Sequence, residues 1–171
     1  MMGTILIDTD QTFTSLMQTV SSFDEDQLND IPFEGSWTAG QVVQHLIISN
    51  SGFIEVMQGP VKEAERKPDQ LVAEIKKDFL NFDIKMESPE FVLPLLIDYS
   101  KPRQLGTLEN IKSGLLHLIE STELDKLCLT FELPGYGFLT RVEAVYFVVY
   151  HTQRHTHQLR NIYQYLSKVE K

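Results

Sequence analysis

The sequence predicts an all-α protein: a four-helix bundle with a long crossover between the second and third helices and a short extra helix. Four segments predict this fold class, because in each of them apolar residues recur every three or four positions, as on one helix face. Two of the segments also begin with the spacing of a capping box. A length of 171 residues, with 42% hydrophobic and 23% charged residues, fits one packed unit, so we expect residues 1–171 to form a single domain.

The first predicted helix runs from about Asp8 to Val20 or slightly beyond. Threonine, serine and glutamine lie on one side of it, and the other side is apolar. The apolar side carries Phe13, Leu16, Met17 and Val20. We therefore expect an amphipathic helix.

The second predicted helix begins at Thr38, because Thr38 and Gln41 have the three-residue spacing of a capping box. Trp37, just before the cap, is interpreted as a packing residue that forms a hydrophobic staple at the start of the helix. Apolar residues then recur at helical spacing as far as the adjacent helix breakers Gly59 and Pro60, where we expect the helix to end.

The last predicted helix is the longest. Thr140 and Glu143 form a second capping box, and neither glycine nor proline follows before about Lys168. The third predicted helix precedes it and runs from about Thr107 to about Glu123. Its apolar residues, spaced by three and four, are Leu108, Ile111, Leu115, Leu118 and Ile119.

The connections between these helices are less regular. Within the crossover, the chain from Pro68 to Phe82 is predicted to form the short extra helix, and the chain from Ser88 to Gly106 is predicted to be irregular because it contains three prolines. Such a long irregular segment is either a lid or binding loop, or simply a well-packed crossover. The segment from Cys128 to Phe138 is either a short extended piece or a loop, and we expect no substantial sheet.

Charge and composition exclude some classes of function. A net charge of −9 without a basic stripe disfavours nucleic-acid binding. No apolar stretch approaches the roughly 18 residues that span a bilayer, so we expect no membrane insertion. The residues from Met1 to Asp10 lack the basic start of a secretion signal. The single cysteine, Cys128, is interpreted as a buried structural thiol, and we expect a cytoplasmic protein.

Three histidines are expected to point into the core. His151 and His155 lie four residues apart on the inward seam of the last helix, with Gln158 also on that seam. His45 lies on the inward seam of the second helix. Burying three neutral imidazoles would cost about 1–3 kcal/mol for each unmade hydrogen bond, whereas a shared ion satisfies much of that need. We therefore predict a divalent metal site at His45, His151 and His155.

The alternative is that each of these histidines bonds to a neighbouring carbonyl or carboxylate and holds no metal. His117 and His157 lie off the inward seams and are expected to face solvent. Gln41 and Gln158 each lie about one turn from a predicted ligand. Each either accepts a hydrogen bond from a metal-bound ring and so orients it, or serves only as a capping or core-polar residue.

A site with three imidazole ligands is chemically open. The ion keeps its full double charge and at least one free position, which favours an anion: hydroxide from bound water or the thiolate of a small cosubstrate. Imidazole suits zinc, nickel, iron and copper better than magnesium or calcium, and we expect the ion to be zinc or nickel. The sequence contains neither a Ser-His-Asp pattern nor a glycine-rich phosphate loop.

Three stretches resemble the DinB-like superfamily: residues 37–46, residues 150–159 with the histidine pair, and the loop at residues 131–140. The resemblance covers most of the chain. It implies a four-helix bundle whose divalent metal is held by one histidine on the second helix and an H-x-x-x-H pair on the last, which correspond to His45, His151 and His155. Related proteins include thiol-dependent transferases and isomerases that act with glutathione, mycothiol or bacillithiol. The resemblance does not imply DNA binding.

Several functions stay open at this point. One is a metal-dependent enzyme, by resemblance a thiol S-transferase that joins a small thiol to an electrophile, or else a hydrolase. Another is a noncatalytic protein that binds a metal or a small molecule in the same cleft. A third is a helical interaction protein whose histidines hold no metal. Members of this family often pair through their helices, so a homodimer is expected.

Overall fold

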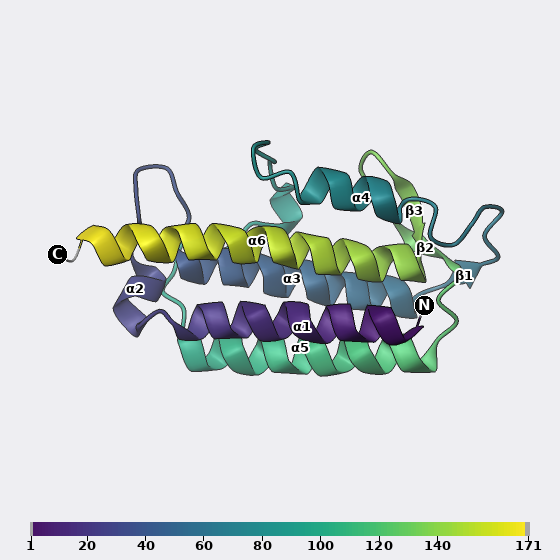
Figure 1. The fold of residues 1–171 in the computed structure, drawn as a ribbon, viewed down its shortest axis with the longest axis horizontal. Helices are drawn as coiled ribbons and strands as arrows, with labels where there is room; N and C mark the ends of the chain where they lie inside the picture. The colour runs from purple at the N-terminus through teal and green to yellow at the C-terminus, as the bar shows by residue number, and fades with distance from the viewer. Residues whose placement is uncertain (1, 170–171) are drawn as a thin grey trace.

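Four long helices form the body of the protein in this computed structural model, which describes residues 2–169. They are α1 (Met2–Ser21), α3 (Ala39–Gln58), α5 (Lys101–Ser121) and α6 (Arg141–Val169). Each of α1 and α3 packs against both α5 and α6. Figure 1 shows the four helices side by side, with α1 and α6 running in one direction and α3 and α5 in the other. The prediction of a mostly helical chain is confirmed.

Both predicted capping boxes are present. At the start of α3, the Gln41 backbone N–H donates to Thr38 Oγ1 at 3.1 Å, and the Thr38 N–H donates to Gln41 Oε1 at 2.9 Å. At the start of α6, the Glu143 N–H donates to Thr140 Oγ1 at 3.3 Å, and the Thr140 N–H donates to Glu143 Oε2 at 2.9 Å. These bonds satisfy N–H groups that have no partner within the helix, which fixes where the two helices begin.

Several predicted boundaries are wrong. The third long helix, α5, begins at Lys101 rather than near Thr107, because a proline in the first turn of a helix costs no hydrogen bond there. The supposedly irregular segment before it contains that first turn and a short 3-10 helix, η1 (Glu90–Val92). The short helix of the crossover, α4 (Val72–Phe79), is shorter than predicted, and α1 begins earlier than predicted.

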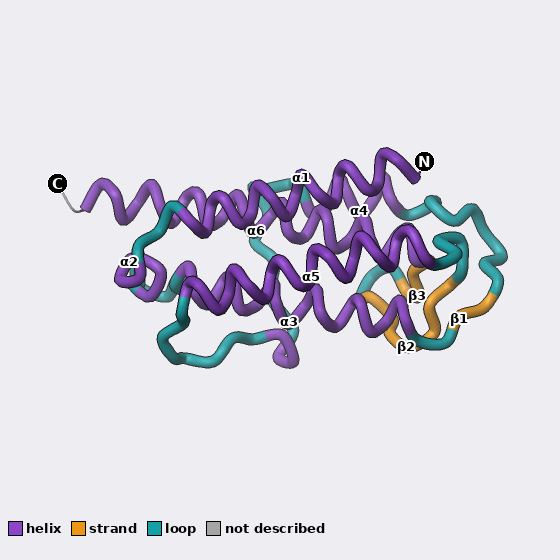
Figure 2. The backbone as a smooth tube through the Cα atoms, turned by 90° about the horizontal axis from the view of Figure 1, so that it is seen from below, coloured by secondary structure: helices purple, strands orange, loops and turns teal. Residues whose placement is uncertain are grey.

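We expected no substantial sheet, and the structure contains a small one, in which Cys128 to Phe138 forms the short extended piece that the sequence left open. Three antiparallel strands, β1 (Val61–Lys62), β2 (Leu127–Leu133) and β3 (Gly137–Thr140), pair in the order β1-β2-β3. Figure 2 shows them gathered at one end of the helices. The turn between β2 and β3 uses positive φ angles of 87° at Gly135 and 73° at Gly137, which favour glycine.

A further short helix, α2 (Glu25–Asn29), was not predicted. It lies at the opposite end of the molecule from the sheet (Figure 1). Its own capping box joins Asp24 and Gln27, so the sequence did carry a local signal for it. The crossover from α3 to α5 contains β1, α4 and η1, and α4 packs along α6.

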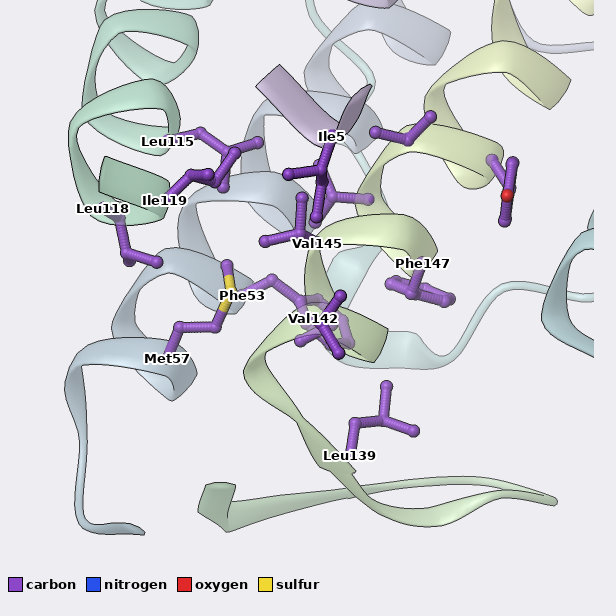
Figure 3. Close-up of a cluster of buried hydrophobic side chains, with 14 of the residues drawn as sticks. Ile5, Phe53, Met57, Leu115, Leu118, Ile119, Leu139, Val142, Val145 and Phe147 are labelled. Carbon is purple, nitrogen blue, oxygen red and sulfur yellow. The ribbon is translucent and has the colours of Figure 1, made fainter. Parts of the chain in front are cut away.

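The buried apolar side chains form two clusters along the helices. The first contains Ile5 of α1, Phe53 of α3, Leu115 of α5 and Val145 of α6, which Figure 3 shows directed toward one another. The second lies nearer α2. It contains Leu16, Val20, Phe23, Leu28, Val42, Leu46, Leu108, Leu159 and Ile162. Each fully buried side chain of this size contributes about 1.5–3 kcal/mol, so the two clusters hold the helices together.

Within residues 2–169, no helix is both long enough and apolar enough to cross a membrane.

Candidate metal centre

Two of the three predicted histidines lie where one apolar cluster gives way to the other. Along α3, Leu46 belongs to the second cluster and Phe53 to the first. Along α6, Tyr150 belongs to the first cluster and Leu159 to the second. On α6 the intervening turns therefore carry His151 and His155, whereas on α3 His45 lies directly before Leu46, among residues of the second cluster.

The structure brings the three rings together. His151 Nε2 lies 3.1 Å from His45 Nε2 and 3.1 Å from His155 Nε2. One ligand atom from each of the three residues lies within 4.8 Å of those of the other two. His45 and His151 are buried, and His155 is partly exposed. Two rings come from adjacent turns of α6 and the third from the facing helix α3.

The outer ring nitrogens determine which way the lone pairs point. His45 Nδ1 lies 2.9 Å from the Val92 carbonyl oxygen, and His155 Nδ1 lies 2.8 Å from Gln158 Oε1. Both oxygens can only accept, so each Nδ1 carries the proton of its neutral ring. The Nε2 atoms of these two rings are then unprotonated, and their lone pairs face His151.

Two of these three separations fit a shared ion. With metal–nitrogen bonds of about 2.0–2.1 Å, ligand nitrogens are separated by about 3.0 Å at right angles and about 3.4 Å in a tetrahedron. The two separations of 3.1 Å lie within that interval. Without an ion, two unprotonated nitrogens compete for at most one N–H of the middle ring. The cluster can therefore hold a metal ion, and its donor atoms suit one.

Burial keeps the rings neutral. Desolvation lowers the pKa of His45, against a hydrogen bond to the Val92 carbonyl that raises it. Desolvation lowers the pKa of His151 well below its ordinary value, with the two neighbouring rings adding to the effect. The pKa of His155 falls to about 3, again mainly because of burial. At neutral pH all three rings are unprotonated at one nitrogen, the form that binds metals.

His151 sits in aromatic surroundings. Its ring stacks on Phe147, with centroids 5.3 Å apart and planes at 12°, and meets Phe79 edge-on at 6.0 Å. His151 Nδ1 is buried without a hydrogen-bond partner among the described residues. No acceptor fixes the tautomer of this ring, so nothing prevents it from presenting Nε2 as a ligand.

Arg154, next to His155 in sequence, holds part of the crossover against the site. Its guanidinium donates to the carbonyl oxygens of Phe79, at 3.2 Å, Asn81, at 2.8 Å, and Ile84. A cation at these carbonyls caps the C-terminal end of α4. Burial lowers the pKa of this guanidinium. The residues after α4 are thus fixed beside the histidines by a side chain from α6.

A second connection fixes the start of α4. The fully buried Glu143 forms an ion pair with Arg66 and accepts the backbone N–H of Leu71 at 2.9 Å. The same carboxylate caps α6 through Thr140. Because Glu143 is both the cap of α6 and the partner of Arg66, the helix that carries two histidines and the helix that covers them are positioned by one residue.

A cavity of about 1000 Å³ adjoins the cluster, and all three histidines line it. Its other walls come from α3, α4, the segment from α4 to η1, and the β2–β3 hairpin. A small molecule that enters this cavity has direct access to the three rings.

The two glutamines that could orient a metal-bound ring have different partners in the structure. Gln158 lies against His155 Nδ1. Gln41 places its side-chain oxygen on the Thr38 N–H as part of the capping box, and the acceptor beside His45 is instead the Val92 carbonyl. No local pattern in the sequence could have indicated Val92, because it lies 47 residues further along the chain.

His117 is exposed, as expected. His157 is only partly exposed, contrary to expectation, because its ring stacks on Phe82 at 4.1 Å and lines the cavity. Cys128 is buried, which raises the pKa of its thiol and agrees with a structural role. Trp37 packs at the start of α3, and its ring centroid lies 5.3 Å from that of His45.

A family model described as the DinB superfamily matches residues 8–159. The chain belongs to the DinB superfamily. The match includes all three histidines and the whole of the crossover. Comparison of this DinB-superfamily chain with curated proteins and with solved structures found no significant match.

Proposed function

We propose that this DinB-superfamily protein binds one divalent metal ion through His45, His151 and His155. The strongest support is the geometry of the ring nitrogens. His151 Nε2 lies 3.1 Å from the Nε2 atoms of both His45 and His155, and in those two rings Nδ1 already donates a hydrogen bond, which leaves Nε2 free to bind an ion. Four long helices that pack pairwise around the histidines support a four-helix bundle as the scaffold of this site.

Zinc or nickel is the proposed ion, because three neutral imidazoles suit these ions better than magnesium or calcium. A bound ion of this kind acts as a Lewis acid that favours an anionic ligand. The protein contributes the rest: Val92 and Gln158 orient two of the rings, and Phe79 and Phe147 exclude water from the third.

The proposed activity is that of a thiol S-transferase. In this reaction the thiol gives up its proton to solvent and its sulfur forms a bond to a carbon of the electrophile. The leaving group, such as a halide, departs with the electrons of the bond it breaks. The adjoining cavity supports this activity, because it is large enough for both reactants. A noncatalytic protein that binds a metal or small molecule is the alternative, and homodimer formation stays a prediction.

Metal content and turnover test these proposals separately. We expect untagged protein, dialysed against zinc or nickel, to retain about one ion per chain and His151→Ala to retain none. His117→Ala is the matched control, because His117 is exposed and away from the cluster. Equal metal content in His151→Ala and wild type would contradict the proposed site.

For the activity, thiol consumption is measured with a halogenated aromatic and several low-molecular-weight thiols, with and without the ion. The transferase proposal expects a rate that requires the ion and is lost on chelation. Retention of the metal with no metal-dependent rate for any thiol would favour the noncatalytic alternative.

A further inference from the structure

The cavity beside the histidines has an aromatic wall. Phe147 stacks on His151, and Phe53 lies 4.4 Å from Phe147, measured between ring centroids. Phe131 follows at 5.9 Å from Phe53, and Phe91 at 6.0 Å from Phe131. These rings line the cavity in a connected series that begins at the cluster and extends to η1 and β2. Such a wall favours apolar and ring-bearing ligands over polar ones.

The charged residues of the cavity offer little to an anion. Three of those that line it are acidic: Asp78, Asp83 and Glu87. Of the two basic ones, Arg154 already donates to three backbone carbonyls. The other, Lys85, is exposed and stands between two of the acidic residues in the sequence. A carboxylate on a ligand in this cavity would therefore lose hydration without gaining an ion pair that compensates for the loss.

We propose that the cavity takes an apolar, ring-bearing ligand with a single anionic donor atom, such as a thiolate, directed at the three imidazoles. It discriminates against ligands that carry further carboxylates. The proposal that the anionic atom is directed at the imidazoles rests on the proposed metal site. The preference for apolar rings rests only on the residues that line the cavity. A volume of about 1000 Å³ accommodates a ligand of two or more fused or linked rings.

Gly52 provides a way to fill this cavity without disturbing the fold. It lies on α3, two turns after His45, and lines the cavity. A Cβ atom built at Gly52 meets no atom within 4 Å. Replacing a glycine inside a helix with leucine also raises helix propensity, so Gly52→Leu is expected to fold at least as well as wild type. Gly106 on α5 is exposed, has equal free space and does not line the cavity, so Gly106→Leu is the matched control.

The first experiment uses metal-free protein and a neutral fluorescent probe, N-phenylnaphthylamine. We expect saturable binding to wild type and to Gly106→Leu, and binding roughly tenfold weaker or absent in Gly52→Leu. Equal binding to all three would place the probe elsewhere, for example on exposed apolar side chains of the crossover, and would overturn the assignment of an apolar cavity. This outcome does not depend on the metal.

The second experiment uses zinc-loaded protein and calorimetry with two thiols. A naphthylmethanethiol carries one anionic atom next to a ring system, and mercaptosuccinate carries the same kind of alkyl sulfur with two carboxylates. We expect the naphthylmethanethiol to bind at least roughly tenfold more tightly, with the advantage lost in Gly52→Leu and kept in Gly106→Leu. Equal or tighter binding of mercaptosuccinate would overturn the inference. Failure of wild type to bind zinc would overturn the proposed function and the direction of the anionic atom, while the first experiment would still decide the preference for apolar rings.

Discussion

The pair α1–α5 and the pair α3–α6 occupy opposite edges of the same four-helix arrangement, yet their buried residues differ in kind. Between α1 and α5 the buried side chains are mainly aliphatic or aromatic, such as Phe13 and Leu115. Between α3 and α6 they include three histidines, with Asn50 donating to Thr152 at 3.1 Å. Of the three buried side-chain atoms that have no hydrogen-bond partner among the described residues, Asn50 Oδ1 and His151 Nδ1 lie on this second pair and Gln104 Oε1 lies on α5. The α3–α6 pair therefore buries more polar side chains than the α1–α5 pair, which costs stability.

The largest effect on stability is expected from a substitution in the α1–α5 pair. Phe13→Ala removes a side chain that is 0% exposed, and the lost burial and the resulting cavity should reduce the free energy of unfolding by about 3–5 kcal/mol. Chemical denaturation measures this loss. The increase in stability on adding zinc should be the same as in wild type. A variant that lost the zinc effect along with stability would show that the two helix pairs are coupled.

The next effect is the stabilisation of the α3–α6 pair by zinc. A ligand present at 100 times its dissociation constant stabilises the folded state by about 2.7 kcal/mol. We expect zinc to raise the unfolding free energy of wild type and His117→Ala by this order, and to leave that of His151→Ala unchanged. Denaturation with and without zinc measures the difference. If zinc still stabilised His151→Ala, the histidines of the α3–α6 pair would not be the zinc ligands.

A smaller effect is expected from the side chain that joins α6 to the crossover. Arg154→Gln removes charge-assisted bonds to three carbonyls, and because the site is only partly buried we expect a loss of about 1–2 kcal/mol. Hydrogen exchange should accelerate for amides in residues 72–84. Arg160→Gln, on an exposed part of the same helix, is the control. Unchanged exchange in Arg154→Gln would show that other contacts hold this segment.

The smallest effect is a dependence on pH in the metal-free protein. The pKa of His155 is about 3 when folded, against 6.5 as the ordinary value. Above pH 6.5 the ring is neutral in both states and contributes nothing to the pH dependence. Below it the unfolded state binds a proton that the folded state does not, so stability falls, by about 1 kcal/mol between pH 6.5 and about 5.5. His155→Gln should reduce this dependence, and His117→Gln, at an exposed position, should not. Identical slopes for wild type and His155→Gln would show that His155 is not held neutral.

The features that could be predicted from the sequence are those encoded locally. A capping box needs only residues three apart, so the starts of α3 and α6 were predicted correctly from Thr38 and Thr140. The convergence of the histidines needed one further step, the assumption that two inward helix faces oppose each other. The structure bears out that their rings meet.

The features that could not be predicted depend on distant partners. The two-residue strand β1 exists because it pairs with Leu127 and Cys128, more than sixty residues away, and has no periodic pattern of its own. The contact between Val92 and His45 uses a backbone carbonyl, which every residue possesses. Arg154 likewise binds carbonyls, so its role in holding the end of α4 leaves no trace in residue types.

The protein contains one tryptophan, and its indole ring lies beside His45. Binding of an ion at the imidazoles would therefore change the surroundings of the sole indole fluorophore, and emission from unlabelled protein would then report whether the site is occupied. Nickel, with unpaired electrons, should quench that emission, whereas zinc, with a filled d shell, should shift it with little quenching. A simple titration can thus tell apart the two ions between which the ligand set alone does not choose.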